Sequence, residues 1–160
     1  MGNSLSILES GIGTSVILWF QSWRSELISD VFLPFHFAGT ETFFLILLTI
    51  VYWLISKPVG RRLTIVFLLS AWLNGFCKQL WKRPRPFQVS IDVNPSFQET
   101  GFGLPSGHTQ TATSVAVYLM TVVKRNWGVI LLFLYMFLMG ISRMLHGVHF
   151  PHDVVLGWLL

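Results

Sequence analysis

The chain of 160 residues is 52% hydrophobic and only 11% charged, with a mean hydropathy of +0.61. Soluble domains usually carry about a quarter charged residues, so this composition excludes an ordinary soluble domain and predicts a membrane protein. The net charge of +4 does not indicate nucleic-acid binding, because the basic residues lie at expected membrane boundaries or in short motifs and form no basic stripe.

Residues 12–37 are only partly apolar and allow two interpretations. Aromatic and aliphatic residues recur at three- and four-residue spacing from Trp19 to Phe32, which favours an amphipathic helix lying in the membrane interface. A spanning helix with a polar face is the alternative, because charged and amide side chains interrupt the apolar run. His36, close to Pro34, is expected at the water boundary and is assigned no chemistry.

Four apolar segments follow, and each approaches or reaches the roughly 20 residues that a membrane-spanning helix needs. They cover residues 37–56, 63–81, 106–123 and 128–145. Residues 154–160 are apolar but too short to cross a bilayer, so a final helix is expected to be cut short. The sequence therefore predicts an all-α, multi-pass transmembrane helix bundle.

We expect one membrane-embedded domain over residues 1–160. Within it, residues 1–37 form the N-terminal interfacial or spanning segment, and residues 39–160 form the catalytic helical core.

The connections between the expected spans differ in length and charge. Residues 57–62 and 124–127 are short turns, and the even number of crossings between them places both on one side of the membrane. Together they hold five basic residues, namely Lys57, Arg61, Arg62, Lys124 and Arg125. The positive-inside rule assigns this side to the cytoplasm. Residues 82–104 are longer than most structureless loops, which favours a role in covering or selecting a substrate.

Residues 142–153 place a cation, imidazoles and a carboxylate within a dozen positions. Arg143 offers a fixed fork of donors that suits phosphate oxygens. His149 is followed four residues later by Asp153, and at this spacing one side chain can orient another across a helical turn. Pro151 is tolerated in the first turn of a helix, so a helix is expected to begin beside it. Asp153 can then hold His149 with one ring nitrogen unprotonated, as a candidate nucleophile.

Residues 78–86 read K-x6-R-P, at the end of the second expected span. Lys78 and Arg85 supply two more cations, and the prolines on either side of Arg85 end the helix and restrict the backbone there. This segment and residues 142–153 are expected on the same membrane face.

Residues 105–108 read P-S-G-H and begin the third expected span on that face. Ser106 can cap the helix, so that backbone N–H groups and the positive end of the helix dipole point at an anion. Gly107 allows the backbone to approach that anion closely.

These three motifs resemble the signature of the type 2 phosphatidic acid phosphatase superfamily, integral-membrane lipid phosphate phosphatases whose soluble relatives include vanadium haloperoxidases. The resemblance covers roughly residues 39–160, with every key position filled. It implies hydrolysis of a lipid phosphate ester or diphosphate through a phosphohistidine intermediate.

The resemblance also implies a role for each motif residue. The catalytic set comprises His149 as the nucleophile, His108 as the acid that protonates the leaving group and then activates water, and Asp153. The phosphate-binding set comprises Lys78, Arg85, Ser106, Gly107 and Arg143. No metal or other cofactor is expected, because the cationic side chains supply the electrostatic stabilisation.

The expected partners are the bilayer and a lipid phosphate, and no nucleic acid. Phosphatidate, phosphatidylglycerol phosphate, undecaprenyl diphosphate, lipid A phosphate and sphingoid phosphates all remain candidates. Residues 39–74 resemble a bacterial branch of the superfamily, which favours a bacterial inner membrane. The positive-inside rule then places the active site on the extracytoplasmic face.

Three alternatives remain beside this interpretation. The first is a non-catalytic protein that binds or moves phospholipid, and the second is a vanadate-dependent haloperoxidase, whose known forms are soluble and larger. The third is a metal site built from His146, His149 and His152, but Pro151 interrupts the helical register between them. We therefore expect His146 and His152 to pack near the site or support it.

Overall fold

The computed structural model of the chain describes residue 6 and residues 9–160, and all of the regular structure in this part is helical. The elements are η1 (Glu9–Gly13), α2 (Thr14–Ser22), α3 (Glu26–Phe37), α4 (Glu41–Ile50), η2 (Val51–Ile55), α5 (Lys57–Trp81), α6 (Pro86–Val89), α7 (Gly107–Val122), α8 (Asn126–Leu145) and α9 (Pro151–Leu159). The predicted all-α class is confirmed.

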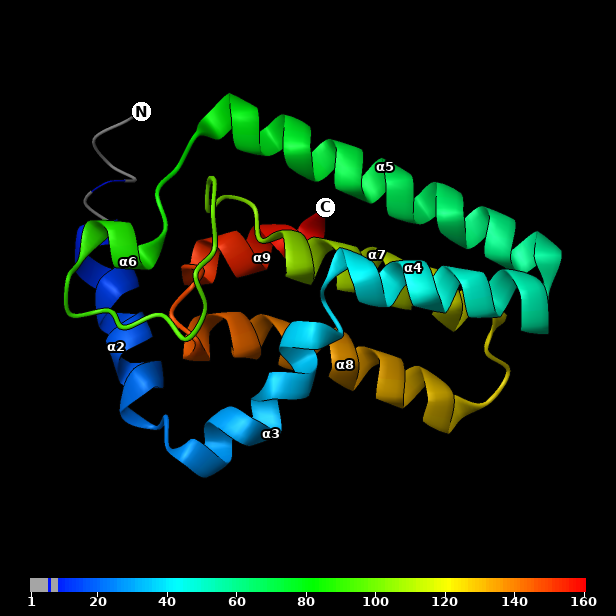
Figure 1. Cartoon of the computed structure of the whole chain (residues 1–160), viewed down its shortest axis with the longest axis horizontal. Coiled ribbons are helices and arrows are strands. Elements are labelled where there is room, and N and C mark those ends of the chain that lie inside the picture. Colours follow the sequence, from blue (N-terminus) through cyan, green and yellow to red (C-terminus); the bar gives the residue numbers. More distant parts are fainter. Residues whose placement is uncertain (1–5, 7–8) are drawn as a thin grey trace.

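The long helices form a bundle in which α7 is central. It packs against α5, α8 and α9, and most of its buried residues are alanine or threonine. Such side chains let neighbouring backbones approach closely, as is usual between membrane helices. In Figure 1, the α4–η2 junction with α5 and the connection from α7 to α8 lie toward one end of the bundle. The segments that carry the three motifs lie away from that end.

Two parts of the described chain are long and apolar enough to cross a membrane. They are residues 57–89, which contain α5, and the helix α8. The helix α3, together with α4 and η2, passes the same test as one span bent by 58°. The helix α7 occupies the third expected span but is 16 residues long.

The N-terminal region forms two helices where a single helix was expected. Between α2 and α3 the chain breaks at residues 23–25, and the Ser25 hydroxyl accepts a hydrogen bond from the Ile28 backbone N–H at 3.3 Å. A serine in this position satisfies one of the free N–H groups at the start of a helix. The break therefore follows from a local cap that the apolar periodicity did not reveal.

The predicted basic turn at residues 57–62 is wrong, because these residues form the first turns of α5. The chain reverses one residue earlier, at Ser56, whose backbone is extended. Pro58 lies in the first turn of α5. Backbone N–H groups in a first turn have no acceptor within the helix, so the N–H that proline lacks is not needed there. Lys57, Arg61 and Arg62 therefore lie in the first turns of a helix, while Lys124 and Arg125 remain in the connection before α8.

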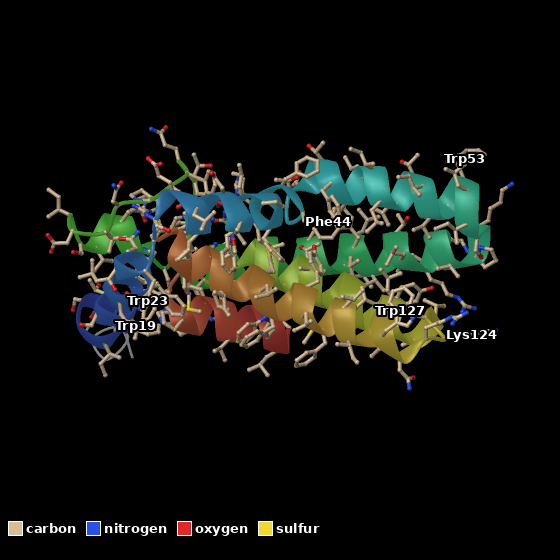
Figure 2. The ribbon with its side chains drawn as sticks, turned by 90° about the horizontal axis from the view of Figure 1, so that it is seen from below. Trp19, Trp23, Phe44, Trp53, Lys124 and Trp127 are labelled. Atoms are coloured by element: carbon tan, nitrogen blue, oxygen red, sulfur yellow. The ribbon has the colours of Figure 1, made fainter. Side chains whose placement is uncertain are left out.

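Exposed tryptophans mark both ends of the bundle. Figure 2 shows Trp53 and Trp127 near one end, with Lys124, and Trp19 and Trp23 near the other. Tryptophan is enriched at the two boundaries between a bilayer and water, so this arrangement agrees with a bundle that crosses the membrane along its long axis.

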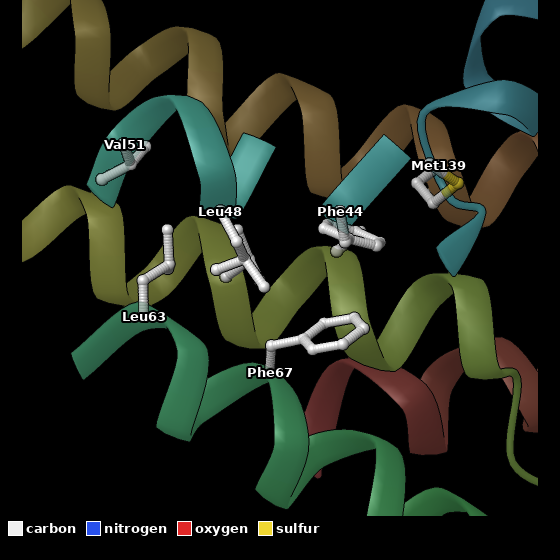
Figure 3. Packing of buried hydrophobic residues seen from close by; sticks show 8 residues of the cluster. Phe44, Leu48, Val51, Leu63, Phe67 and Met139 are labelled. Atoms are coloured by element: carbon white, nitrogen blue, oxygen red, sulfur yellow. The ribbon is translucent and has the colours of Figure 1, made fainter. Parts of the chain in front are cut away.

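The hydrophobic core lies between α4, η2, α5, α7 and α8 (Figure 3). Its buried members are Phe44, Leu48, Val51, Leu63, Phe67, Ala112, Val115 and Met139. They join the continuous stretch from α4 through η2 to α5 with α7 and α8, which lie later in the chain, so this core fixes how the motif-bearing helix ends are placed.

The last helix is anchored by close packing. A Cβ atom on Gly157 of α9 would lie 3.0 Å from the Ser106 carbonyl oxygen, so glycine permits the close approach of α9 to the start of α7. The Ser106 backbone N–H donates to the Asp153 carbonyl at 3.0 Å, and Trp158 Nε1 donates to the Met136 carbonyl of α8 at 3.0 Å. These contacts hold the His-x3-Asp segment against two other helices.

We expect Leu63→Ala to destabilise the protein more than Leu69→Ala on the same helix. Leu63 is fully buried and Leu69 is 61% exposed. Truncating a buried leucine removes its packing and leaves a cavity, at a cost of about 2–5 kcal/mol. Thermal unfolding of both variants in detergent checks this expectation, and equal losses of stability would contradict the core assignment.

Candidate active site

A cavity of about 810 Å³ opens where the three motifs meet. Lys78, Arg85, Gly107, His108 and His149 all line it. These side chains come from the end of α5, the start of α6, the start of α7 and the segment before α9. The fold therefore brings together residues that lie up to 71 positions apart in the sequence.

The guanidinium of Arg85 is buried and tied to backbone carbonyls on two loops. Its Nε donates to the Gly101 carbonyl, one terminal nitrogen donates to the Val148 carbonyl, and the other donates to the Thr100 carbonyl, each at 3.1 Å. Pro86 begins α6 directly after it and fixes the backbone direction. Arg85 is therefore held in place by the backbone of residues 100–101 and 148.

His149 and Asp153 form the contact that their spacing predicted. The His149 Nδ1 lies 3.2 Å from Asp153 Oδ2, which also accepts the Phe150 backbone N–H at 2.9 Å. As predicted, α9 begins at Pro151. The His149 Nε2 lies 3.3 Å from an Arg85 nitrogen, which can only donate. This pattern assigns the ring proton to Nδ1 and leaves a lone pair on Nε2.

Burial holds the pKa of His149 well below its ordinary value of 6.5. The positive charges of Arg85, Lys78 and Arg143 lower it further, in that order. Both causes disfavour the imidazolium form. His149 is therefore a neutral imidazole near pH 7, as a nucleophilic histidine must be.

Arg143 is buried at the end of α8 and reaches a residue outside the motifs. One of its terminal nitrogens lies 3.2 Å from His36 Nδ1, and the other donates to the Ser142 hydroxyl at 3.2 Å. The His36 ring stacks on Phe97, with a distance of 3.8 Å between ring centroids. His36 lines the cavity, a position that its place in the sequence did not predict.

Glu99 also lies in the site, although no sequence motif indicated it. One carboxylate oxygen is 3.2 Å from an Arg85 nitrogen, and the other is 3.6 Å from an Arg143 nitrogen. It belongs to the long connection at residues 82–104, which was predicted to cover or select a substrate. The length of this connection was the only feature of the sequence that indicated a role in the site, and it did not point to Glu99 in particular.

The P-S-G-H residues do not all face the cavity. Ser106 is the N-cap residue of α7 by position, but its hydroxyl pairs with the Thr109 hydroxyl at 3.0 Å and makes no capping bond. Ser106 therefore lies at the expected N-cap position, but its hydroxyl does not cap the helix. Its side chain is fully buried and does not line the cavity. Gly107 does line it, and a Cβ atom there would lie 3.1 Å from Asn74 Oδ1.

His108 points a free ring nitrogen into this region. Its Nε2 is buried and has no hydrogen-bond partner among the described residues. Its ring is 5.6 Å from the His36 ring, nearly parallel to it. An imidazole nitrogen without a protein partner is available to a substrate atom.

The two other histidines of the C-terminal motif lie outside the cavity lining. The His146 Nδ1 is 3.0 Å from the Ser96 hydroxyl, and the ring packs edge-on against Phe97. His152 Nε2 is 3.3 Å from Asp153 Oδ1. Their positions agree with the expected packing and supporting roles.

His36, Glu99 and His108 are the residues with the geometry to hold a metal ion in the described part of the chain. Their ligand atoms lie within 4.8 Å of one another. The carboxylate is already paired with two guanidinium groups, and a further cation would be repelled by them. The charges at this site therefore suit an anion better than a metal ion.

Comparison with known proteins identifies the family. Residues 59–160 match the family model of the PAP2 superfamily. The chain is 28% identical to sphingosine-1-phosphate phosphatase 1 of Rattus norvegicus over 127 residues, covering 76% of this chain and 30% of that protein. It is 33% identical to undecaprenyl-diphosphatase of Sulfolobus acidocaldarius over 109 residues, covering 66% of this chain and 51% of that protein. The chain thus spans 30% of the first of these relatives and 51% of the second.

The fold agrees with a solved member of the same group. The crystal structure of Aquifex aeolicus LpxE matches with a TM-score of 0.84 and 29% sequence identity, over 93% of this chain and 89% of that one. The resemblance seen in the three motifs is thereby confirmed, and the chain belongs to the PAP2 superfamily.

Proposed function

We propose that the chain hydrolyses the phosphate ester or diphosphate of a lipid and releases inorganic phosphate through a phosphohistidine intermediate. The observation that carries this proposal is the position of His149, oriented by Asp153 on one nitrogen and next to Arg85 on the other. A neutral imidazole held in this way is a nucleophile aimed at an anion-binding group.

In the first step, the lone pair on His149 Nε2 attacks phosphorus and forms an N–P bond. The ester P–O bond breaks, and His108 donates a proton to the departing alkoxide. His108 holds this proton when the phosphate is bound, because the adjacent negative charge favours the imidazolium form. Asp153 holds the Nδ1 proton of His149 and stabilises the positive charge that the ring gains. Asp153 therefore acts through His149 as a positioning residue.

In the second step, water attacks the phosphohistidine. His108, now neutral, takes a proton from this water, the N–P bond breaks, and inorganic phosphate leaves with His149 restored. The free Nε2 of His108 supports this assignment.

Three cations offset the charge of the transferring phosphoryl group. Lys78 and Arg85 line the cavity, and Arg143 lies close enough to share the Glu99 carboxylate with Arg85. Fixed cations in a partly buried site stabilise developing negative charge without a metal ion. We propose a metal-independent reaction on this basis, with the Gly107 backbone beside the same phosphate.

The apolar residues that line part of the cavity support a lipid substrate. Phe44 of α4 and Phe67 and Ala71 of α5 line the cavity beside the charged residues. An amphipathic substrate suits such a site, with its phosphate among the cations and its chains against apolar side chains. Phosphatidate, phosphatidylglycerol phosphate, undecaprenyl diphosphate, lipid A phosphate and sphingoid phosphates remain the substrates to compare.

We place the protein in a bacterial inner membrane, with the site on the extracytoplasmic face. The five basic residues of segments 57–62 and 124–127 support this orientation, because these segments lie at the end of the bundle away from the motifs (Figure 1).

Phosphate release from the lipid panel, measured in detergent with a chelator present, tests the proposal. We expect the parent protein to retain its activity under chelation. His149→Ala should lower it by at least about 1,000-fold, because a group that bonds covalently to phosphorus is lost. His146→Gln is the matched control, since His146 is buried in the same segment but does not line the cavity. A folded parent protein that releases no phosphate from any of these lipids would favour a binding or lipid-moving role.

Asp153→Asn should lower kcat by roughly 10²- to 10⁴-fold, as expected when an imidazole loses the carboxylate that fixes its tautomer. The ¹⁵N spectrum of the His149 ring should show loss of the single Nδ1-protonated form, and Asp153→Glu should restore part of the activity. A purely structural role would lower stability without changing this tautomer.

We expect His149 to remain neutral below pH 6.5 in a ¹⁵N NMR titration, because burial and adjacent cations lower its pKa. Lys78→Met removes one of these cations, so the imidazolium is repelled less and the pKa of His149 should rise. The neutral fraction at a given acidic pH then falls. An unchanged or lowered pKa in this variant would contradict the charge arrangement described above.

A further inference from the structure

The Glu99 carboxylate lies between the two arginines that are expected to bind phosphate. Its oxygens are 3.2 Å from Arg85 and 3.6 Å from Arg143, whose guanidinium groups are both almost completely buried. Arginine stays charged in proteins, so two such groups in one site need a nearby negative charge. Glu99 supplies this charge in the present structure.

Glu99 is held by charge more than by hydrogen bonds. The 3.6 Å separation from Arg143 is longer than a hydrogen bond, and Oε1 of Glu99 has no hydrogen-bond partner among the described residues although it is buried. A phosphate group has more oxygens with which to fill the same donors and carries more charge. It can therefore replace this carboxylate.

Arg85 does not depend on Glu99 for its position. Three backbone carbonyls hold its guanidinium whether or not the carboxylate is present. The connection that carries Glu99 is fixed on both sides, since the Ser96 N–H donates to the His146 carbonyl at 3.1 Å and the Gly103 N–H donates to the Arg83 carbonyl at 2.8 Å. A change of the Glu99 side-chain rotamer is thus enough to clear the site.

We propose that Glu99 occupies the phosphate position of the unliganded site and competes with phosphate for Arg85 and Arg143. The substrate phosphate displaces the carboxylate, and the carboxylate returns as inorganic phosphate leaves, which limits inhibition by the product. The two anions exclude each other because like charges so close together repel. This inference rests on the proposed function for the identity of the ligand.

Binding of inorganic phosphate and orthovanadate to Glu99→Gln tests the competition. The amide keeps the shape of the side chain and removes its charge. We expect both anions to bind about tenfold more tightly or better, which corresponds to at least roughly 1.4 kcal/mol. The inhibition constant of phosphate in the activity assay should fall by the same factor. Glu41→Gln is the matched control, because Glu41 lines the same cavity but is exposed and forms no ion pair within the described chain.

The binding measurement is repeated in the His149→Ala background, where it does not depend on turnover. An inactive parent protein whose anion affinity still rises in Glu99→Gln would count against the proposed reaction and support the competition. Unchanged affinity would overturn the competition, and weaker affinity would show that Glu99 instead orients the arginines. If Glu99→Gln does not fold, Glu99→Asp keeps the charge on a shorter side chain and should give a smaller increase in affinity.

Discussion

Two guanidinium groups buried at one end of a membrane helix bundle are the constraint on which the site depends. Arg85 and Arg143 cannot lose their charge, so the surrounding chain has to supply acceptors and counter-charge. The backbone carbonyls of residues 100, 101 and 148 accept hydrogen bonds from Arg85. These bonds hold the segment before α9 close to the end of α5. Burial and the same cations both keep His149 neutral, so the charges that suit an anion also favour the form of the imidazole that a nucleophile requires.

The features that sequence reasoning predicted correctly are those set by local rules. The apolar runs indicated α5 and α8 because a bilayer fixes the length of a spanning helix. Pro151 fixed the start of α9, since a proline is tolerated in the first turn of a helix and not in its interior. That start placed Asp153 within 3.2 Å of His149, as the four-residue spacing required.

The features that were missed depend on contacts between distant segments or on the direction of one side chain. His36 and Glu99 join the site only because α3 and the connection before α7 fold over the ends of α5 and α8. Neither residue belongs to a motif or stands out by spacing. The Ser106 hydroxyl was predicted to cap α7, but it pairs with the Thr109 hydroxyl instead. The sequence alone does not show whether a serine hydroxyl bonds to a backbone N–H or to a neighbouring hydroxyl. The chain reversal was predicted at residues 57–62 but lies at Ser56. Pro58 is tolerated at the start of a helix as well as in a turn, so the sequence did not distinguish the two.

The position of the site at helix ends follows from the cost of charge in a bilayer. A charged side chain is expensive at the bilayer centre, and the interior of this bundle is accordingly filled by a hydrophobic core. The motif cations lie where helices end, beside loops that offer carbonyls, while Phe44 and Phe67 continue the same cavity toward the core. One cavity therefore joins a cationic end to an apolar wall. This polarity is the physical basis for proposing a substrate whose phosphate is attached to a hydrocarbon chain.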